Sequence, residues 1–306
     1  MKISNTVRLH VAAALMVLFW ASAYIGIRLG LKGYTPGAMA LFRYLVASFC
    51  MLIVYRMKVR STPLQRIRWS DLIAVAILGI LGFAIYNIAL NYGELTVTAG
   101  ITSFIVSQTP VLMTLFAIIF FRHRLTEWAG LGTVISFLGI LLISVGEAKG
   151  LHWDWGVLYL LIATLCGSLY SLFQKPLLQR LHPVVFTAYA IWFGTLALMI
   201  YWPTLLHEIA HAPLKTTLAV VYNGIFPAAI AYLLWGLVLA ELPAIKAASF
   251  LYLVPVVATL LGMVMLHEMP TWISLSGSVL ALSGAILVNR HTAQEEPAKK
   301  EQTELS

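Results

Sequence analysis

The sequence predicts an all-α membrane protein of ten transmembrane helices, built as two inverted five-helix repeats. Three observations lead to this fold class. Of the 306 residues, 60% are hydrophobic and 10% are charged, whereas a soluble domain carries about 25% charged residues. Ten apolar runs are long enough to cross a bilayer. Residues of the first half also recur in the second half at a nearly constant spacing.

The ten spans follow from the apolar runs in chain order, because a spanning helix needs about 20 mostly apolar residues. In the first run, Ala21-Ser22-Ala23 resembles a signal-peptide cleavage site, but apolar residues continue past it and make the run long enough to span. Pro36 opens the second run, and short gaps with turn formers and charges separate the others. The predicted spans cover residues 9–29, 36–55, 70–90, 97–121, 127–145, 155–173, 184–202, 216–239, 244–266 and 270–289.

The distribution of Lys and Arg predicts the orientation, because cytoplasmic segments of membrane proteins are enriched in both. With a cytoplasmic N-terminus, the inside segments hold 14 of these residues and the outside loops hold 4. We therefore expect a multi-pass protein of the cell (inner) membrane, with residues 1–8 and a disordered polar tail, 290–306, both cytoplasmic. The net charge of +8 reflects this topology, and no basic stripe with interleaved aromatic residues indicates a nucleic acid partner.

An internal repeat divides the chain into residues 9–146 and 153–289, with five predicted spans in each. Because five is odd, the two copies must cross the membrane in opposite orientations, as in many secondary transporters that hold substrate near the midplane. The glycine pairs within each copy are seven residues apart and predict close helix contacts. At a shift of 145 residues Pro110 matches Pro255, Thr114 matches Thr259, Gly132 matches Gly277 and Gly139 matches Gly284; at 146, Ser22 matches Ser168, Tyr24 matches Tyr170 and Tyr86 matches Tyr232.

Several short motifs occur in a specific order and spacing. They are Phe19-Trp20-Ala21-Ser22, Pro36 with Arg43, Thr98 to Pro110-Val111, Ala247-Ala248-Ser249 to Pro255-Val256, Leu266-His267-Glu268, and the four paired glycines. With these motifs the chain resembles EamA-type members of the drug/metabolite transporter superfamily from about residue 10 to about residue 290. The resemblance implies a ten-helix bundle around a central cavity that carries amino acids, metabolites or drugs, often outward. In that family a Glu usually follows both the fourth and the ninth span; here Glu268 fills the second place, and His123 fills the first.

Polar and aromatic residues at interior depth are the candidate substrate contacts. A stripe at helical spacing in the fourth span is matched in the ninth, and such a stripe either lines a cavity or mediates helix packing. A proline in each stripe frees the carbonyl of Val106 or Leu251. The stripes are Ser103, Ser107, Pro110 and Thr114, matched by Ala248, Tyr252, Pro255 and Thr259. The aromatic candidates for cavity walls are Trp20, Tyr24, Tyr86, Tyr170, Trp192, Tyr232, Trp235 and Tyr252.

Arg43 is the most costly residue of the predicted spans, since it lies seven residues inward from Pro36, about 10 Å at 1.5 Å per residue. Two readings remain open. Arg43 either anchors a substrate carboxylate or other anion, or bonds to backbone carbonyls in a structural role. Lys246, near the cytoplasmic end of the ninth span, is more simply explained by extending to the interface.

A zinc site is the main alternative, because His207-Glu208-Ile209-Ala210-His211 has the HExxH sequence of zinc metalloproteases. Pro203 and Pro213 bracket this segment in a predicted outside loop, which favours a short loop helix. A membrane zinc metallohydrolase would use His207 and His211 as ligands.

The preferred reading is a secondary transporter that exports amino acids or related small metabolites by alternating access, and not an enzyme. Its expected partners are the small-molecule substrate and the lipid bilayer, and no cofactor is expected, since no nucleotide-binding motif is present. No Asp or Glu lies deep in a predicted span, so the sequence does not support proton coupling through a buried acid. The two cysteines, Cys50 and Cys166, lie in apolar runs and are expected to be free thiols.

Overall fold

The computed structural model of the protein describes residues 5–61, 67–109, 111–113, 115–116, 127–147, 154–242, 247 and 250–287. Every regular element in these ranges is a helix, as the sequence predicted. Within the described ranges, six helical segments are long and apolar enough to cross a membrane. They are Val7–Gly30, Pro36–Arg60, Trp69–Gly93, Trp155–Leu178, Pro183–His211 and Leu214–Glu241.

Shorter apolar helices occupy the regions of the other four predicted spans. They are α5 (Ala99–Val106), Gly130–Ile143 within α7 (Glu127–Glu147), Phe250–Met265, and a final helix, Trp272–Leu287. The arrangement of ten spans in two inverted repeats therefore stays a prediction. The tail 290–306 and the predicted motif residues Pro110, Thr114, His123, Lys246, Ala248 and Ser249 lie outside the described residues.

The first half begins with two long helices and a third that changes its geometry part-way. Pro36 is the first residue of its helix, where a proline costs no hydrogen bond, and the side chain of Glu208 accepts a hydrogen bond from the Thr35 N–H at 2.9 Å. The elements are α1 (Asn5–Gly30), α2 (Pro36–Ser61), α3 (Trp69–Gly79), the π-helix η1 (Ile80–Ile85), α4 (Tyr86–Gly93) and α5.

The second half contains a second π-helix, η3, at a matching position. The 146-residue shift of the sequence repeat carries Ile80–Ile85 onto residues 226–231, which overlap η3. The elements are α8 (Trp155–Leu178), α9 (Pro183–Leu198), the 3-10 turn η2 (Met199–Tyr201), α10 (Trp202–His211), α11 (Leu214–Asn223), η3 (Gly224–Ile230), α12 (Ala231–Glu241), the 3-10 turn η4 (Phe250–Tyr252) and α14 (Leu253–Met265).

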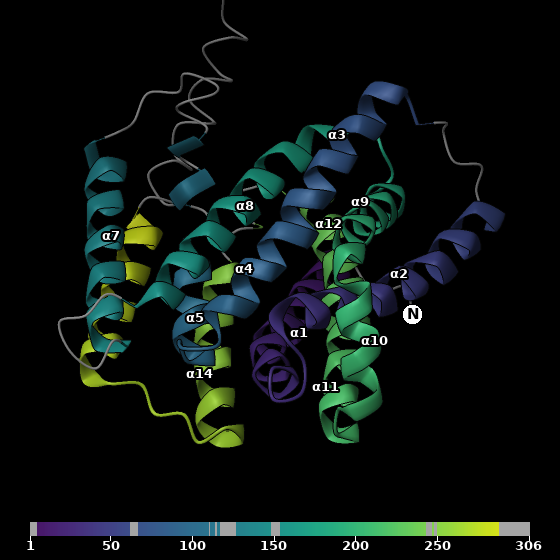
Figure 1. The fold of residues 1–306 in the computed structure, drawn as a ribbon. Coiled ribbons are helices and arrows are strands. Elements are labelled where there is room, and N and C mark those ends of the chain that lie inside the picture. The colour runs from purple at the N-terminus through teal and green to yellow at the C-terminus, as the bar shows by residue number, and fades with distance from the viewer. Residues whose placement is uncertain are drawn as a thin grey trace, which may run out of the picture.

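Most of these helices share one hydrophobic core, in which α2 packs on α9, α4 on α8, and α1 on α14. Figure 1 shows α7 and the final helix (yellow) side by side at one edge of the molecule. A Cβ added to Gly139 would lie 2.4 Å from the Ala281 nitrogen, so the two backbones approach as closely as the paired glycines predicted. On its other faces α7 exposes large apolar side chains such as Val134 and Leu138, as expected for contact with lipid.

Candidate functional site

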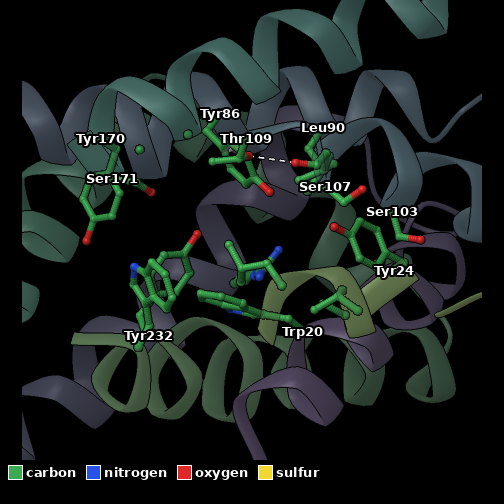
Figure 2. A pocket seen from close by; sticks show the side chains of 18 residues that line it. Trp20, Tyr24, Tyr86, Leu90, Ser103, Ser107, Thr109, Tyr170, Ser171 and Tyr232 are labelled. Atoms are coloured by element: carbon green, nitrogen blue, oxygen red, sulfur yellow. Dashed lines mark hydrogen bonds between the residues drawn. The ribbon is translucent and has the colours of Figure 1, made fainter. Parts of the chain in front are cut away.

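A cavity of about 100 Å³ lies between helices from both halves of the chain. A cavity that holds a single water molecule has a volume of roughly 10–15 Å³, so this larger cavity has room for a small solute. Side chains from α1, α2, α4, α5, α8, α12 and α14 form its wall (Figure 2). Nine of the thirteen predicted contact residues line it: Trp20, Tyr24, Arg43, Tyr86, Ser103, Ser107, Tyr170, Tyr232 and Trp235.

The wall is largely aromatic. The Trp20 ring lies 5.2 Å from the Tyr232 ring and 5.8 Å from the Trp235 ring. Behind them Phe83 is 4.9 Å from Tyr232 and 5.2 Å from Tyr170, in edge-to-face geometry. Edge-to-face contacts are the favoured arrangement of aromatic pairs. The rings in Figure 2 therefore form a firm apolar surface around the central space.

The two π-helices set the direction of two of these rings. Tyr86 directly follows η1, and Tyr232 is the second residue after η3. A π-helical turn contains an additional residue, which rotates the following side chains about the helix axis, and such turns are frequent at functional sites. Glycines make room for the rings: the Tyr86 ring lies against Gly167, and the Tyr170 ring lies against Gly82.

A row of hydroxyl groups on the fourth predicted span supplies polar atoms to the cavity. Ser107 donates to the carbonyl of Phe104 at 2.7 Å, and Thr109 donates to the carbonyl of Val106 at 2.7 Å (dashed in Figure 2). The carbonyl that Pro110 was expected to free is thus bonded to a hydroxyl. Because each hydroxyl uses its proton within the helix, its oxygen can still accept a hydrogen bond from a solute.

Arg43 contributes a buried positive charge to the cavity wall. Its side chain is 4% exposed, and Nη1 donates to Asn87 Oδ1 at 3.0 Å. Asn87 is itself held by hydrogen bonds to the Tyr44 hydroxyl and the Phe83 carbonyl. The Arg43 Nε atom is buried and has no hydrogen-bond partner among the described residues. In the part of the chain that the structure describes, no carboxylate oxygen lies within 4.0 Å of this guanidinium. The cavity wall therefore carries a buried positive charge that no carboxylate neutralises within this distance.

Three other predicted contact residues do not reach the cavity. Trp192 packs on Tyr55 and Tyr189 and donates to the Ser48 carbonyl at 3.3 Å. The Tyr252 hydroxyl donates to the Ala285 carbonyl at 2.9 Å, and Pro255 is buried within α14 away from the wall. The 3-10 turn η4 explains why Tyr252, in the polar stripe of the ninth predicted span, does not face the cavity. A 3-10 turn has three residues per turn, so Tyr252 leaves the face that it would occupy in an α-helix. Leu251 and Val254 line the cavity instead.

The HExxH segment lies in α10, which follows α9 and η2 without a gap within the apolar segment Pro183–His211. Pro203 lies inside this helix, so the segment is not the separate loop helix that the sequence predicted. The His207 and His211 rings lie 5.0 Å apart, but the Glu208 carboxylate caps the start of α2 through Thr35. Among the described residues no group of three or more His, Cys, Asp and Glu side chains is placed to hold a metal ion. The structure gives the zinc hydrolase alternative no support in these ranges.

Glu94 is a feature that the sequence analysis missed. It follows α4 between two predicted spans, yet its side chain is fully buried, and both carboxyl oxygens lack hydrogen-bond partners. The signal that could have found it is spacing, because Tyr86, Leu90 and Glu94 follow each other at four-residue intervals on one helix face. Tyr86 and Leu90 line the cavity, so Glu94 lies one turn beyond it.

Comparisons with known proteins identify the family of the chain. The EamA-like transporter family matches residues 8–145 and again residues 154–290. The chain is 35% identical to the "Uncharacterized transporter YdfC" of Bacillus subtilis, over 92% of this chain and 90% of that protein. It is 36% identical to a "Probable terminal-alkyne amino-acid exporter" of Streptantibioticus cattleyicolor, over 95% and 96%.

A solved crystal structure has the same fold, with a TM-score of 0.64 at 18% identity, over 92% of this chain and 96% of that chain. The family matches extend over nearly the whole chain, and relatives above 30% identity are named transporters. The chain therefore belongs to the EamA-like transporter family.

Proposed function

We propose that this protein is a secondary transporter that exports amino acids or related small metabolites across the cell (inner) membrane. The single observation that carries the proposal is the cavity wall, in which one unpaired buried cation, Arg43, lies among aromatic rings. A guanidinium recognises a carboxylate through two parallel hydrogen bonds. The rings of Trp20 and Tyr232 offer an apolar surface to the rest of the solute. An amino acid with an apolar side chain has both features.

A relative supports the substrate class. The Streptantibioticus cattleyicolor protein, 36% identical over nearly the whole chain, is named as an exporter of terminal-alkyne amino acids. A terminal alkyne is small, linear and apolar, and it suits a narrow aromatic cavity. We extend amino-acid export to this chain as a proposal and expect the cavity to accept short apolar side chains.

Alternating access between two inverted halves is the proposed mechanism. Two separate family matches, one in each half, and π-helices at equivalent positions both support it. Tyr86 and Tyr232 are matched in the repeat, and they contribute to the same cavity from opposite halves. In this mechanism the halves rock about the solute and expose it to one side at a time.

Ligand-induced stabilisation of the purified protein tests the proposal, since a ligand that binds the native state raises its melting temperature. We would compare L-norvaline and its alkyne analogue L-propargylglycine with their carboxamides. The acids should stabilise the wild type, and the amides should do so less. In Arg43→Lys the affinity for the acids should fall about tenfold or more, because the bidentate fork is lost.

Arg8→Lys is the matched control, because Arg8 lies on an exposed face in a surface ion pair with Glu241. Counterflow of labelled norvaline in proteoliposomes then tests transport itself. Equal stabilisation of the wild type by acids and amides would contradict the role of Arg43. Absence of counterflow for every amino acid tested would contradict the substrate class.

A further inference from the structure

An ion pair and its hydrogen bonds join three segments beyond the cavity, at the ends that the charge distribution assigns to the outside. Arg28 Nε, near the end of α1, donates to Glu268 Oε1 at 2.7 Å. Glu268 Oε2 accepts from the Ala99 N–H at the start of α5, at 2.9 Å. Arg28 Nη1 donates to the backbone carbonyl of Glu94. We call this set, Arg28, Glu268 and the backbones of Glu94 and Ala99, the outer lock.

Among the described residues, the lock leaves the Glu94 carboxyl group without a hydrogen-bond partner. Arg28 bonds to the carbonyl of Glu94 and to the carboxylate of Glu268, and neither carboxyl oxygen of Glu94 receives a hydrogen bond. The side chain is 0% exposed, so bulk solvent does not reach the two carboxyl oxygens. A carboxylate buried without donors carries a large desolvation cost, and it normally binds a proton instead of remaining charged.

Charged and titratable groups face Glu94 from several elements. Arg28 and Tyr24 on α1, Arg43 on α2, Tyr86 on α4 and Glu268 after α14 all interact with it electrostatically. At the start of α8, Asp154 is occupied by hydrogen bonds from Thr96 and the Gly156 N–H. Glu94 directly follows the apolar segment Trp69–Gly93. Burial raises the pKa of Glu94 well above its usual value; Arg28 and Arg43 oppose this rise, and Glu268 adds to it.

We propose that Glu94 is a proton-binding site whose occupancy is linked to the outer lock: it holds a proton while the lock is closed and releases it when the lock opens. The inference rests on the proposed transport function, because it assumes that the cavity opens alternately to the two sides. No Asp or Glu lies deep in a predicted span, and Glu94, just beyond the third span, supplies the buried acid instead.

The proton balance is simple. With the lock closed, Glu94 is a neutral carboxylic acid. When α1, α5 and the Glu268 segment separate, water reaches the carboxyl group, its O–H bond breaks, and the proton leaves on water. The carboxylate that remains is stabilised by hydration and by Arg28, which separation from Glu268 has freed. Because linkage is reciprocal, a low pH on the outer side favours the closed lock.

Thermal unfolding tests proton binding without any substrate. The full-length protein in detergent would be melted between about pH 5 and pH 8.5, as wild type and as Glu94→Gln. An acid whose pKa is higher in the folded state contributes stability that is lost as pH rises through that pKa. Glu94→Gln should therefore match the wild type at the acidic end and melt higher, by at least about 2 °C, at the alkaline end.

Glu127→Gln is the control, because Glu127 lies exposed in the first turn of α7. Its melting temperature should differ from that of the wild type by a constant amount at every pH. If the difference between Glu94→Gln and the wild type is also constant, Glu94 does not exchange a proton in this range and the proposal is overturned.

Thiol labelling tests the link to the lock. In a Cys50→Ala/Cys166→Ala background, Ser103→Cys places one thiol in the cavity wall, four residues beyond Ala99. A membrane-impermeant thiol reagent, added to the outer face of oriented vesicles, reaches this thiol when the lock opens. An exposed thiol from Lys215→Cys corrects for the pH dependence of thiolate formation.

The corrected labelling rate should rise with pH when Glu94 is present and should not depend on pH with Glu94→Gln. Arg28→Gln should label fast at every pH, because the lock is broken. Equal pH dependence with and without Glu94 would overturn the link. Neither assay uses a transported solute, so failure here is distinct from failure of the transport proposal.

Discussion

Arg43 holds its position through a neutral partner and not through an ion pair. Asn87 Oδ1 accepts from the guanidinium, and the amide nitrogen of Asn87 is bonded to Tyr44 and Phe83. This arrangement fixes the direction of the guanidinium and leaves its charge uncompensated. A carboxylate at position 87 would fix the same direction and neutralise the charge.

Asn87→Asp tests this reasoning, because the two side chains have nearly the same shape. The new carboxylate should pair with Arg43, and the affinity for amino acids should fall about tenfold or more while the amides are unaffected. Binding is measured by the same melting-temperature shifts. Unchanged selectivity between acid and amide in a folded Asn87→Asp variant would show that the charge of Arg43 does not attract substrate.

His182 predicts a pH dependence on the side of the molecule opposite the lock. Its Nδ1 accepts from the Val184 N–H at 3.2 Å and caps α9, which requires an unprotonated nitrogen. Burial and the charge of Lys58 lower the pKa of His182. Its contribution to stability is therefore present above about pH 6.5 and is lost as pH falls through the lowered pKa. Asn also caps helices but does not titrate. The melting temperature of His182→Asn should therefore depend less on pH, below about pH 6.5, than that of the wild type.

At the scale of elements, departures from α-helical geometry decide which residues face the cavity. The π-helices η1 and η3 precede Tyr86 and Tyr232, and the 3-10 turn η4 ends at Tyr252. The first two tyrosines line the cavity and the third does not. Helical periodicity alone predicts the same role for all three, because it assumes a constant 3.6 residues per turn.

Close contact between α7 and the final helix depends on the paired glycines, Gly132 and Gly139 with Gly277 and Gly284, which we call the glycine seam. Gly139→Ala should destabilise the protein by about 1–3 kcal/mol, because its Cβ would lie 2.4 Å from the Ala281 nitrogen and 2.6 Å from the Gly277 oxygen. Gly236→Ala is the control, since among the described residues its Cβ would meet Pro183 at 3.5 Å and Thr187 at 3.7 Å, which are ordinary contact distances. The control should be neutral or slightly stabilising in thermal melts. Equal effects of both changes would argue against a tight seam.

At the scale of the whole molecule, the cavity collects residues from both halves of the chain, and the outer lock lies beyond one of its ends. The charge distribution assigns the lock residues to the outside and both termini to the cytoplasm. In that orientation the outer lock joins the outer ends of α1 and α5 to Glu268.

A fusion reporter tests the orientation. Alkaline phosphatase, which is active only outside the cytoplasm, should be inactive when fused after residue 300 and active when inserted after residue 149, in a predicted outside loop. A cytoplasmically active reporter should give the opposite pattern at both positions. Strong phosphatase activity at residue 300 would contradict the even number of spans and the direction assigned to the lock.

The sequence by itself determined that this chain is an all-helical membrane protein of the EamA-like family. Apolar run length and motif order are linear properties, and they can be read without knowing which helices touch. It also singled out Arg43, because a charge far inside an apolar run is costly in any arrangement of helices.

Only the tertiary structure decided which polar residues share the cavity and which do not. In the sequence Trp192 and Tyr252 look like Tyr86 and Tyr232, since all four are aromatic residues deep in predicted spans. In the structure, helix rotation and local changes of helical pitch turn Trp192 and Tyr252 toward other helices. Glu94 reads as a loop residue in the sequence, but its side chain is fully buried in the structure. Its backbone carbonyl accepts a hydrogen bond from Arg28, which also pairs with Glu268 from a distant part of the chain. Burial of a side chain depends on contacts between helices far apart in sequence, which a linear pattern does not contain.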